Sequence, residues 1–420
     1  MGFAQGVSGL NAAASNLDVI GNNIANSATV GFKFSNVLFA DVYAGSRIGL
    51  GTQVAGVSQN FTAGSLQSST RALDVAIVNG DGFFRLASVG GEISYSRNGQ
   101  FNMDNDGYIV NAGGLRLTGY QVAANGSIAG GSPAALQLPT TEMAPNATTG
   151  IVAQFNLDSR STVPVQTPFD AGDSTTYNYA NAATIYDSLG NSHELSTFFV
   201  KTGSGTWDVY ATADGWPLDA AGVKVADADA NGIPDTGGAA IGALTFDTSG
   251  TLTTPADGKL NVAGLDFTNG SSPLTFSINM TGTTQFGNDN DVKKLTQDGY
   301  TSGKLIAFAI NEDGTVTGKY SNEQVKTLGQ IVLSSFANLN GLQPKGDNVW
   351  SETAASGQPL TGTPGSGTKL GALVSGALEA SNVDLTGELV NLIIAQRTYQ
   401  ANAQTVKTQD QVMQTLVNMR

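Results

Sequence analysis

The chain has 420 residues, enough for two or three domains. It contains no cysteine and one histidine, which excludes disulfides, zinc–thiolate sites, cysteine nucleophiles and any metal site with two histidines. Only 13% of its residues are charged, about half the usual share in soluble domains. Gly, Ser, Thr, Asn and Ala fill the difference, a composition typical of exported β-rich proteins and polymer-forming subunits.

The net charge of −14 lies entirely in residues 61–360, because charges of both signs balance in residues 1–60 and 361–420. An acidic middle is unsuited to nucleic acid or to an anionic membrane surface. Neutral ends suit close packing of like copies, since charge buried between subunits is costly. No segment reaches the roughly 18 apolar residues of a membrane span, so no membrane insertion is predicted. The first positive side chain is Lys33, so no Sec-type signal peptide is predicted, and a cytosolic location and a signal-free export route both remain open.

Residues 3–28 predict an amphipathic helix, because small or apolar residues recur at alternating spacings of four and three. The opposite side is polar but almost uncharged. A helix packed on its own domain and one helix of a coiled coil would both give this pattern. The Asn, Ser, Thr and Gly that follow Ile24 predict that the helix ends before Gly31. The large residues of the predicted seam are Phe3, Val7, Leu10, Leu17 and Ile24.

The middle of the chain predicts β structure. Residues 31–70 contain several glycines and short alternating runs, which indicate an extended, hairpin-bearing connector. From Leu73 the apolar period becomes two, and Asn98-Gly99 marks a hairpin turn in a β-meander that reaches Tyr120. Low-complexity residues 121–150 predict a domain boundary. Further strands are predicted over 155–280 and 305–336, with the Ala/Asp/Gly-rich residues 213–243 as a surface insertion.

Residues 379–420 contain no Gly or Pro after Gly387 and predict a helix from Leu385 to Arg420, roughly 50 Å long. Ser381 and Asp384 predict a capping box at its start. The apolar seam is broken by polar residues and needs a partner. We therefore expect it to pair antiparallel with residues 3–28, with further copies of the chain covering what remains exposed. The predicted seam positions are Leu385, Leu389, Leu392, Tyr399, Val406, Met413 and Val417.

Motifs for chemistry give nothing specific. Residues from Asp227 to Asp235 match the first half of a calcium loop, but position 12, where a carboxylate belongs, is Gly238. A calcium loop and an acidic surface loop both remain open. His193 lies in a strand pattern, and no phosphate-binding loop or distinctive carboxylate pair is present. We therefore predict no enzyme activity, no catalytic residue, no metal and no cofactor.

The two ends of the chain resemble a known family. Residues 17–26 (LDVIGNNIAN) running into Thr29-Val-Gly-Phe-Lys33 resemble the N-terminal signature of the axial proteins of the bacterial flagellum. Residues 376–385 (GALEASNVDL) and 395–402 (AQRTYQAN) resemble the matching C-terminal signature. The extra β region and residues 346–350 (GDNVW) are similar to the hook proteins of that family, since the distal rod proteins are much shorter.

The resemblance implies a mainly β fold with α-helical termini and with one β domain inserted into another. The terminal helices would pair as a coiled-coil-like domain. The implied divisions are residues 1–30 and 375–420 for the helical domain, 31–70 and 361–374 for the connector, 71–145 and 286–360 for a discontinuous inner β domain, and 146–285 for the outer β domain.

The resemblance also implies a function. A hook subunit polymerises with itself into a curved, flexible tube that acts as a universal joint between rod and filament. Its implied partners are the distal rod protein, the hook-cap protein, the hook–filament junction proteins and the flagellar type III export apparatus. Its implied location is the extracellular hook, reached without a cleaved signal peptide. The alternatives are a distal rod or junction protein of the same family, and a secreted β-rich adhesin or glycan-active enzyme.

Overall fold

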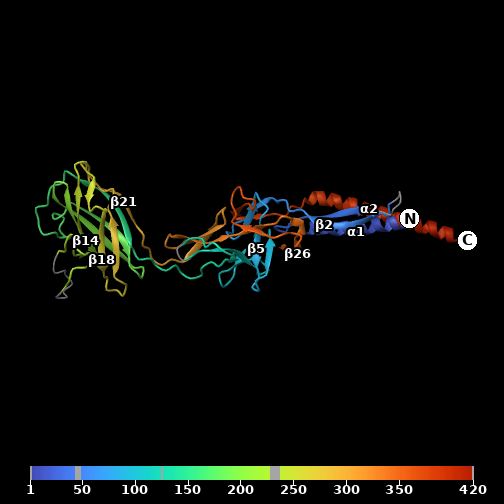
Figure 1. The fold of residues 1–420 in the computed structure, drawn as a ribbon, viewed down its shortest axis with the longest axis horizontal. Helices are drawn as coiled ribbons and strands as arrows, with labels where there is room; N and C mark the ends of the chain where they lie inside the picture. The colour runs from blue at the N-terminus through green and yellow to red at the C-terminus, as the bar shows by residue number, and fades with distance from the viewer. Residues whose placement is uncertain (1, 43–48, 124–125, 228–236, 419–420) are drawn as a thin grey trace. The chain divides into compact units, whose positions relative to one another are not determined.

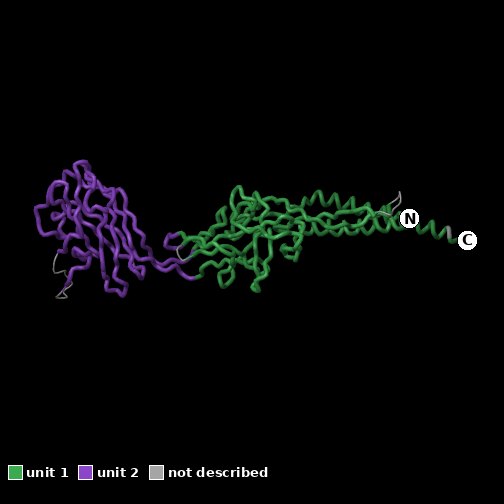
Figure 2. Tube along the Cα trace, viewed as in Figure 1, with its two compact units in different colours: residues 1–140, 306–319, 325–420 green, residues 141–305, 320–324 purple. Residues whose placement is uncertain are grey.

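The computed structural model describes residues 2–42, 49–123, 126–227 and 237–418. The chain is mainly β with a helix near each end, as the sequence predicts (Figure 1). It folds into two compact units (Figure 2). Unit 1 comprises residues 1–140, 306–319 and 325–420, and unit 2 comprises residues 141–305 and 320–324. Residues 228–235 of the candidate calcium loop lie outside the described residues.

The two helices confirm the predictions made for the ends of the chain. Helix α1 spans Gly2–Ala25 and helix α2 spans Leu385–Asn418. The predicted capping box was wrong in one respect, because Asp384 caps α2 without Ser381. The backbone N–H of Thr386 donates to Asp384 Oδ1 at 3.1 Å, whereas the Ser381 hydroxyl accepts from Val383 before the helix begins.

The connector forms the hairpin that its alternating runs predict. Strand β1 (Ser35–Asp41) pairs antiparallel with β2 (Thr52–Gln59), with a bulge after Leu38. Two short ladders then bring the C-terminal segment back beside the first part of the chain. Strand β3 (Leu66–Ser68) pairs with β30 (Ala377–Glu379), and β4 (Val75–Val78) pairs with β29 (Ala372–Ser375).

The largest sheet of unit 1 is built from two distant parts of the chain. Its main path runs β22-β23-β24-β9-β5-β6-β27-β26, so β24 lies beside β9 and β27 beside β6. The strands from the first part are β5 (Phe83–Ala87), β6 (Ile93–Ser96), β7 (Asn102–Met103), β8 (Ile109–Val110), β9 (Arg116–Gln121) and β10 (Ala134–Ala135). Those from the second part are β22 (Leu305–Ile310), β23 (Thr315–Tyr320), β24 (Val325–Ile331), β25 (Leu333–Ser335), β26 (Gln343–Gly346), β27 (Val349–Ser351) and β28 (Leu360–Gly362), with a 3₁₀ turn at Leu339–Gly341.

Low-complexity residues near 136 belong to the core of unit 1. Leu136 and Leu138 are buried beside Ile109 and Leu117. The N–H of Leu138 donates to the carbonyl of Gly107 at 2.8 Å. The boundary predicted over residues 121–150 therefore falls late in that stretch, at residue 140. Two leucines suffice to bury a segment that composition alone marks as a linker.

Unit 2 contains two sheets. The first has the order β12-β13-β14-β16-β17, with β15 beside β14, and the second has the order β18-β19-β11-β20, with β21 beside β11. The strands of the first sheet are β12 (Tyr179–Tyr186), β13 (Ser192–Gly203), β14 (Thr206–Ala213), β15 (Trp216–Pro217), β16 (Gly242–Phe246) and β17 (Leu252–Thr254). Those of the second are β11 (Gly150–Asp158), β18 (Lys259–Leu265), β19 (Leu274–Asn279), β20 (Thr284–Phe286) and β21 (Asp291–Gln297).

The two sheets of unit 2 share one apolar core. Phe155 of β11 and Phe199 of β13 meet edge to face, with ring centroids 5.1 Å apart. The prediction of a surface insertion over residues 213–243 was wrong at its ends. Leu218 and Ile241 are buried in this core, because β15 continues the β14 hairpin and β16 begins directly after Ile241.

The four-part domain division remains a prediction, but one of its boundaries differs from the observed pairing. It put residues 286–360 in the inner β domain, whereas β21 pairs antiparallel with β11 inside unit 2. Strand β11 also pairs with β19 and β20, so β21 belongs to the same sheet as three other strands of unit 2. Sequence periodicity gives a strand's faces but does not identify its neighbour.

We expect the separate cores to melt separately. Phe199→Ala should remove a fully buried ring from unit 2 and lower the stability of that unit by about 3–5 kcal/mol. Calorimetry should then show the unfolding transition of unit 2 at a lower temperature and that of unit 1 at an unchanged temperature. Phe84→Ala, which removes a fully buried ring from unit 1, is the matched control and should move the other transition. A single transition moved by both variants would contradict two independent cores.

Candidate functional site

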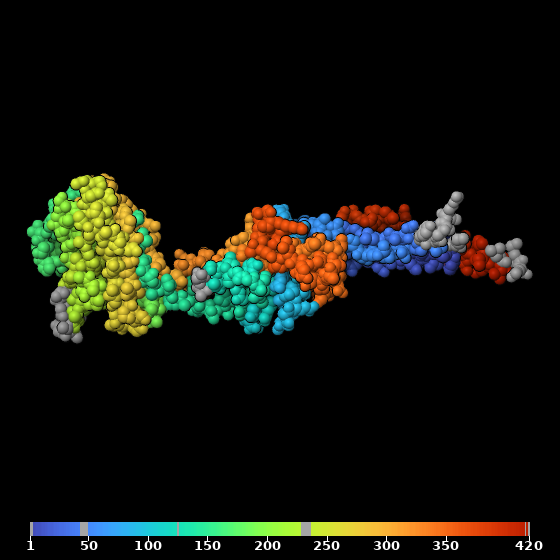
Figure 3. Space-filling view, viewed as in Figure 1, coloured from blue at the N-terminus to red at the C-terminus, as the bar shows by residue number. Residues whose placement is uncertain are grey.

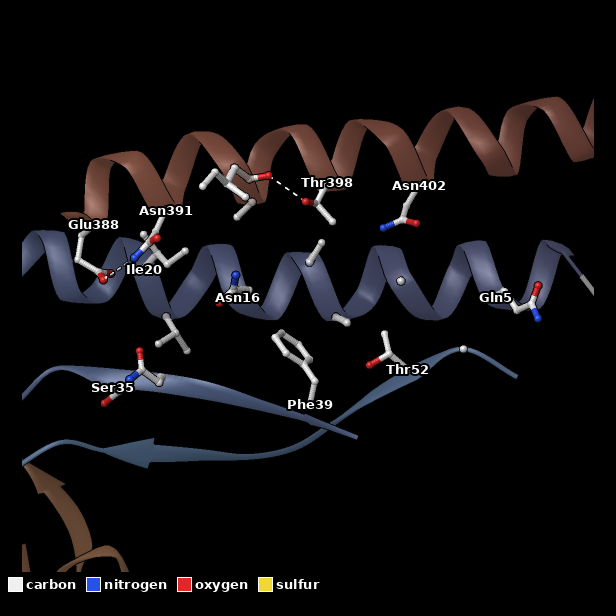
Figure 4. Close-up of a pocket in the computed structure, with 18 residues that line it drawn as sticks. Gln5, Asn16, Ile20, Ser35, Phe39, Thr52, Glu388, Asn391, Thr398 and Asn402 are labelled. Carbon is white, nitrogen blue, oxygen red and sulfur yellow. Dashed lines mark hydrogen bonds between the residues drawn. The ribbon is translucent and has the colours of Figure 1, made fainter. Parts of the chain in front are cut away.

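The two terminal helices pack antiparallel, and small residues on α1 let them approach closely. A Cβ atom on Gly6 would lie 2.9 Å from Val406 Cγ2, and one on Gly9 would lie 2.8 Å from the Asn402 side chain. Farther along, Asn23 of α1 meets Glu388 of α2. The pairing predicted from the sequence is therefore present within one chain (Figure 4).

A buried polar contact fixes the register of this pair. Asn23 is 1% exposed and donates from Nδ2 to Glu388 Oε2 at 3.1 Å and to the Ser35 carbonyl at 2.8 Å. The Ser35 N–H donates back to Asn23 Oδ1 at 2.9 Å, and Asn391 donates to the other oxygen of Glu388. One amide thus joins α1, α2 and β1. A slip of either helix would leave a buried carboxylate or amide without a partner.

The predicted seam positions are not buried between α1 and α2. Seven of them are exposed in the single chain and the other five are half-buried. Apart from Ile20, the buried residues of the two helices that the structure describes are small or polar, such as Ala12, Ala13 and Ala395. Close approach through Gly and Ala leaves most of the large apolar side chains outside the contact, although Val406 meets α1 at Gly6. Exposed are Phe3, Val7, Leu385, Leu389, Tyr399, Met413 and Val417; half-buried are Leu10, Leu17, Ile24, Leu392 and Val406.

A buried ion triad lies where the terminal segments meet the largest sheet of unit 1, called the inner sheet from here on. Lys33 Nζ lies 2.6 Å from Glu379 Oε1, and Arg97 Nη1 lies 3.5 Å from Glu379 Oε2. All three side chains are at most 1% exposed. Lys33 also donates to the Thr62 carbonyl at 2.6 Å. The triad therefore ties the start of the connector and the C-terminal segment to the β5–β6 region.

The electrostatics of the triad depend on its single carboxylate. Burial lowers the pKa of Lys33 and of Arg97, and attraction to Glu379 opposes this for both cations. The N–H of Gly64 donates to the same Glu379 oxygen as Lys33 does, at 2.9 Å. Arg97 also donates a hydrogen bond from Nη2 to the Gly80 carbonyl at 3.0 Å, and its guanidinium lies over the Phe83 ring. Two buried cations thus share one buried carboxylate, and Asp81 adds attraction for Arg97.

Neighbouring contacts extend this junction. The side chain of Asn382 accepts from the Phe34 N–H at 2.8 Å and donates to the carbonyls of Asn60 and Thr62. Trp350 packs on Phe61 and donates from its ring nitrogen to Gln59 Oε1 at 2.8 Å. Strand β2, the segment after it and the start of the C-terminal segment are thereby held to the inner sheet.

A surface pocket of about 770 Å³ runs along α1 between α2 and the β1–β2 hairpin. Figure 4 shows Phe39 reaching toward α1 from the hairpin and Thr398 and Asn402 pointing down from α2. Glu388 is the one charged residue of its lining, and its oxygens are occupied by Asn23 and Asn391. The pocket is therefore lined by apolar groups and neutral amides.

The residues that sequence reasoning missed are Asn23, Lys33, Arg97 and Glu379. A signal was present for two of them, because Lys33 and Glu379 are charges in terminal regions that hold very few. Pairing across more than three hundred residues leaves no local pattern, so their contact could not be read from spacing.

His193 lies in β13, as its strand pattern predicts, and takes part in a polar cluster. Its ring stacks on Phe267, with Nδ1 2.7 Å from Asp214 and Nε2 3.3 Å from Asp187. Burial alone would raise the pKa of the Asp187 carboxyl, but hydrogen bonds from Asn191, Asn269 and His193 hold it well below its usual range. Among the described residues no group of three or more acidic or imidazole side chains is placed to hold a metal ion. The helices that the structure describes are too short or too polar to cross a membrane.

Four family descriptions match the chain in order. They are a flagella basal body rod protein at residues 5–33, the D1 domain of the flagellar hook protein FlgE/F/G at 77–155, the D2 domain of the flagellar basal body protein FlaE at 156–300, and the C-terminal region of the flagellar basal body rod protein FlgEFG at 374–419. The matches cover both units and both terminal helices.

Full-length relatives agree with these matches. The chain is 49% identical to the flagellar hook protein FlgE of Escherichia coli K12 and 47% identical to that of Salmonella typhimurium, over 100% of both chains in each case. It is 32% identical to the flagellar hook protein FlgE of Treponema pallidum, over 99% of this chain and 98% of the relative. These full-length matches support a hook protein rather than the alternatives of a rod or junction protein, an adhesin or an enzyme.

The triad predicts a large effect from a small substitution. Glu379→Gln keeps the shape of the side chain but leaves Lys33 and Arg97 buried without the carboxylate that they share. We expect unit 1 to lose about 3–5 kcal/mol in denaturant unfolding. Glu92→Gln, which breaks the exposed Lys345–Glu92 pair of the same unit, is the control and should cost at most about 1 kcal/mol. Equal losses would show that the buried triad does not stabilise this unit.

Asp187 predicts that unit 2 is sensitive to acid. Because its folded pKa lies below the ordinary value of 3.8, its stabilisation is complete above that pH and is lost as pH falls below it. Asp187→Asn should lower the melting temperature of unit 2 at neutral pH and flatten its decline below about pH 4. The exposed Asp289→Asn should leave that decline unchanged. An unaltered acid profile in Asp187→Asn would contradict this assignment.

Proposed function

Because this chain belongs to the family of bacterial flagellar hook proteins, we propose that it polymerises helically into a curved, flexible tube that passes motor torque from rod to filament. The family is structural and non-enzymatic, and its members associate with themselves. The observation that carries the proposal is full-length identity combined with terminal helices whose large apolar side chains are uncovered in the single chain.

The uncovered apolar residues of α2 supply the surface for self-association. They span the helix from its first turn to its last and would be costly to leave in water. The exposed charged residues between them are Arg397, Lys407 and Asp410, so burial between copies would have to accommodate few ions. Those exposed in the single chain are Leu385, Leu389, Val390, Ile393, Ile394, Tyr399, Val412, Met413 and Val417.

The contacts inside unit 1 support a mechanical division of labour. The ion triad and the Asn23 contact join the terminal helices to the inner sheet, so force applied to the helices would reach the β structure through buried polar bonds. Unit 2 has its own core and carries much of the acidic surface. We propose that the helices carry torque while the outer β structure slides against neighbouring copies as the tube turns.

The location of the chain is the hook, in the extracellular flagellum. We propose that export proceeds through the flagellar type III apparatus without a cleaved signal, which fits the absence of cysteine. The proposed partners along the axis are the distal rod protein, the hook-cap protein and the hook–filament junction proteins.

Charging the exposed row of α2 should stop assembly without unfolding the subunit. Leu389→Glu adds a charge at a side chain that is already 45% exposed, so monomer stability should change by at most about 0.5 kcal/mol. Electron microscopy of the concentrated protein should show tubes for the unchanged chain and none for the variant. Val165→Glu, at an exposed valine of unit 2, should still form tubes. Normal tubes from Leu389→Glu would refute the proposed role of this row.

A further inference from the structure

The last two turns of α2 form an uncharged, apolar projection. Residues 411–418 (QVMQTLVN) carry no acidic or basic side chain, and Val412, Met413 and Val417 are 49%, 59% and 70% exposed. Met413 and Val417 are four residues apart and so share one face of the helix. In the space-filling view the red end of α2 extends past the blue residues of α1 (Figure 3). We call residues 411–418 the α2 tip.

The pocket along α1 is long enough and apolar enough to hold the α2 tip. It is lined on α1 from Gln5 to Ile20, a length of about 22 Å, whereas the α2 tip is about 12 Å long. Its lining includes Gly9 and Ala13, which already lie close to α2, while Phe39 from the hairpin and Ile394 from α2 supply larger apolar side chains. Both of these larger side chains are about half exposed, so apolar surface of the pocket is uncovered in the single chain.

The two surfaces also match in charge. The pocket presents apolar groups and neutral amides, because its one carboxylate, Glu388, is 8% exposed and already bonded. The tip presents apolar groups together with the amides of Gln411, Gln414 and Asn418. Bringing them together buries no unpaired charge, and amides on each side supply donors and acceptors to the other. A charged helix face would leave buried ions in this pocket.

A chain cannot fill its own pocket with its own tip. Helix α2 is continuous, and Asn402, which lines the pocket, is fifteen residues before Val417, a separation of about 22 Å along the axis. The partner is therefore a second copy. A contact between two different surfaces of identical chains does not close on itself unless a ring forms, and otherwise it generates an open helical filament.

From these observations we propose that the α2 tip of one copy docks in the α1 pocket of the next, as a helix in a groove. This inference rests on the proposed self-polymerisation and deepens it by naming the two surfaces that meet. It places the large side chains of Met413 and Val417 against Phe39 or Ile394 of the neighbouring copy.

Engineered disulfides test the contact directly, because the natural chain has no cysteine to give a background. Thr52 and Thr398 lie at opposite edges of the pocket. We would assemble tubes from the double variants Val417→Cys/Thr52→Cys and Val417→Cys/Thr398→Cys, oxidise them and run denaturing, non-reducing gels. A bond needs Cα atoms within about 7 Å. Residues 398 and 417 of one chain are about 28 Å apart along α2, so a bond between them joins two copies.

We expect at least one double variant to lose its monomer band to a ladder of multimers that collapses on reduction. A mixture of the two single variants of that pair should stop at dimers. Val165→Cys combined with the same pocket cysteine is the matched control and should stay monomeric on the gel. Tubes without a ladder in either double variant would overturn the docking while leaving the proposed function standing. Dimers from Val417→Cys alone, as abundant as the ladder, would mean that tips meet tips and would also overturn it. Failure of the unchanged chain to form tubes would instead refute the proposed function.

Discussion

The attachment of the terminal helices depends on one buried carboxylate. Glu379 forms ion pairs with Lys33 from the N-terminal segment and with Arg97 from the inner sheet, and it also accepts a hydrogen bond from the Gly64 N–H. Such a triad adds less net stability than its close contacts suggest, because the desolvation of the ions offsets much of their attraction. It does penalise any arrangement in which the three segments separate. The junction between helices and sheet is consequently specific as well as stable.

The helices themselves are organised for partners outside the chain. Gly6, Gly9 and Ala13 bring α1 against α2, and Asn23 sets the register. This close contact leaves the larger residues, such as Leu389 and Ile393, exposed. Long isolated helices gain little stability from propensity alone, so we expect packing between copies to supply most of the stability of the two terminal helices. Their near-neutral surfaces keep the cost of that packing low.

The sequence predicts the classes of element well, because each has a local cause. Heptad spacing and the absence of Gly and Pro identify α2, and Asp106-Gly107 lies in the turn between the paired strands β7 and β8. The hairpin predicted at Asn98-Gly99 was wrong, because β6 pairs with β5 and β27 rather than with β7. Prediction from the sequence fails where a contact depends on a partner far away in the chain. Nothing local pairs β21 with β11 or Lys33 with Glu379. Composition also misleads at Leu136 and Leu218, where single leucines in glycine- and alanine-rich stretches enter the cores.

The central claim is that unit 1 holds a firm junction while its terminal helices are completed only by neighbouring copies. Hydrogen exchange of monomers and assembled tubes tests this most directly. The account predicts that the amides of Gly31 and Gly64, which donate to Glu379, are protected in both states, because their partners lie within one chain. Amides along α2 should exchange quickly in the monomer and become strongly protected on assembly. Equal protection of α2 in both states, or a junction protected only in tubes, would contradict it.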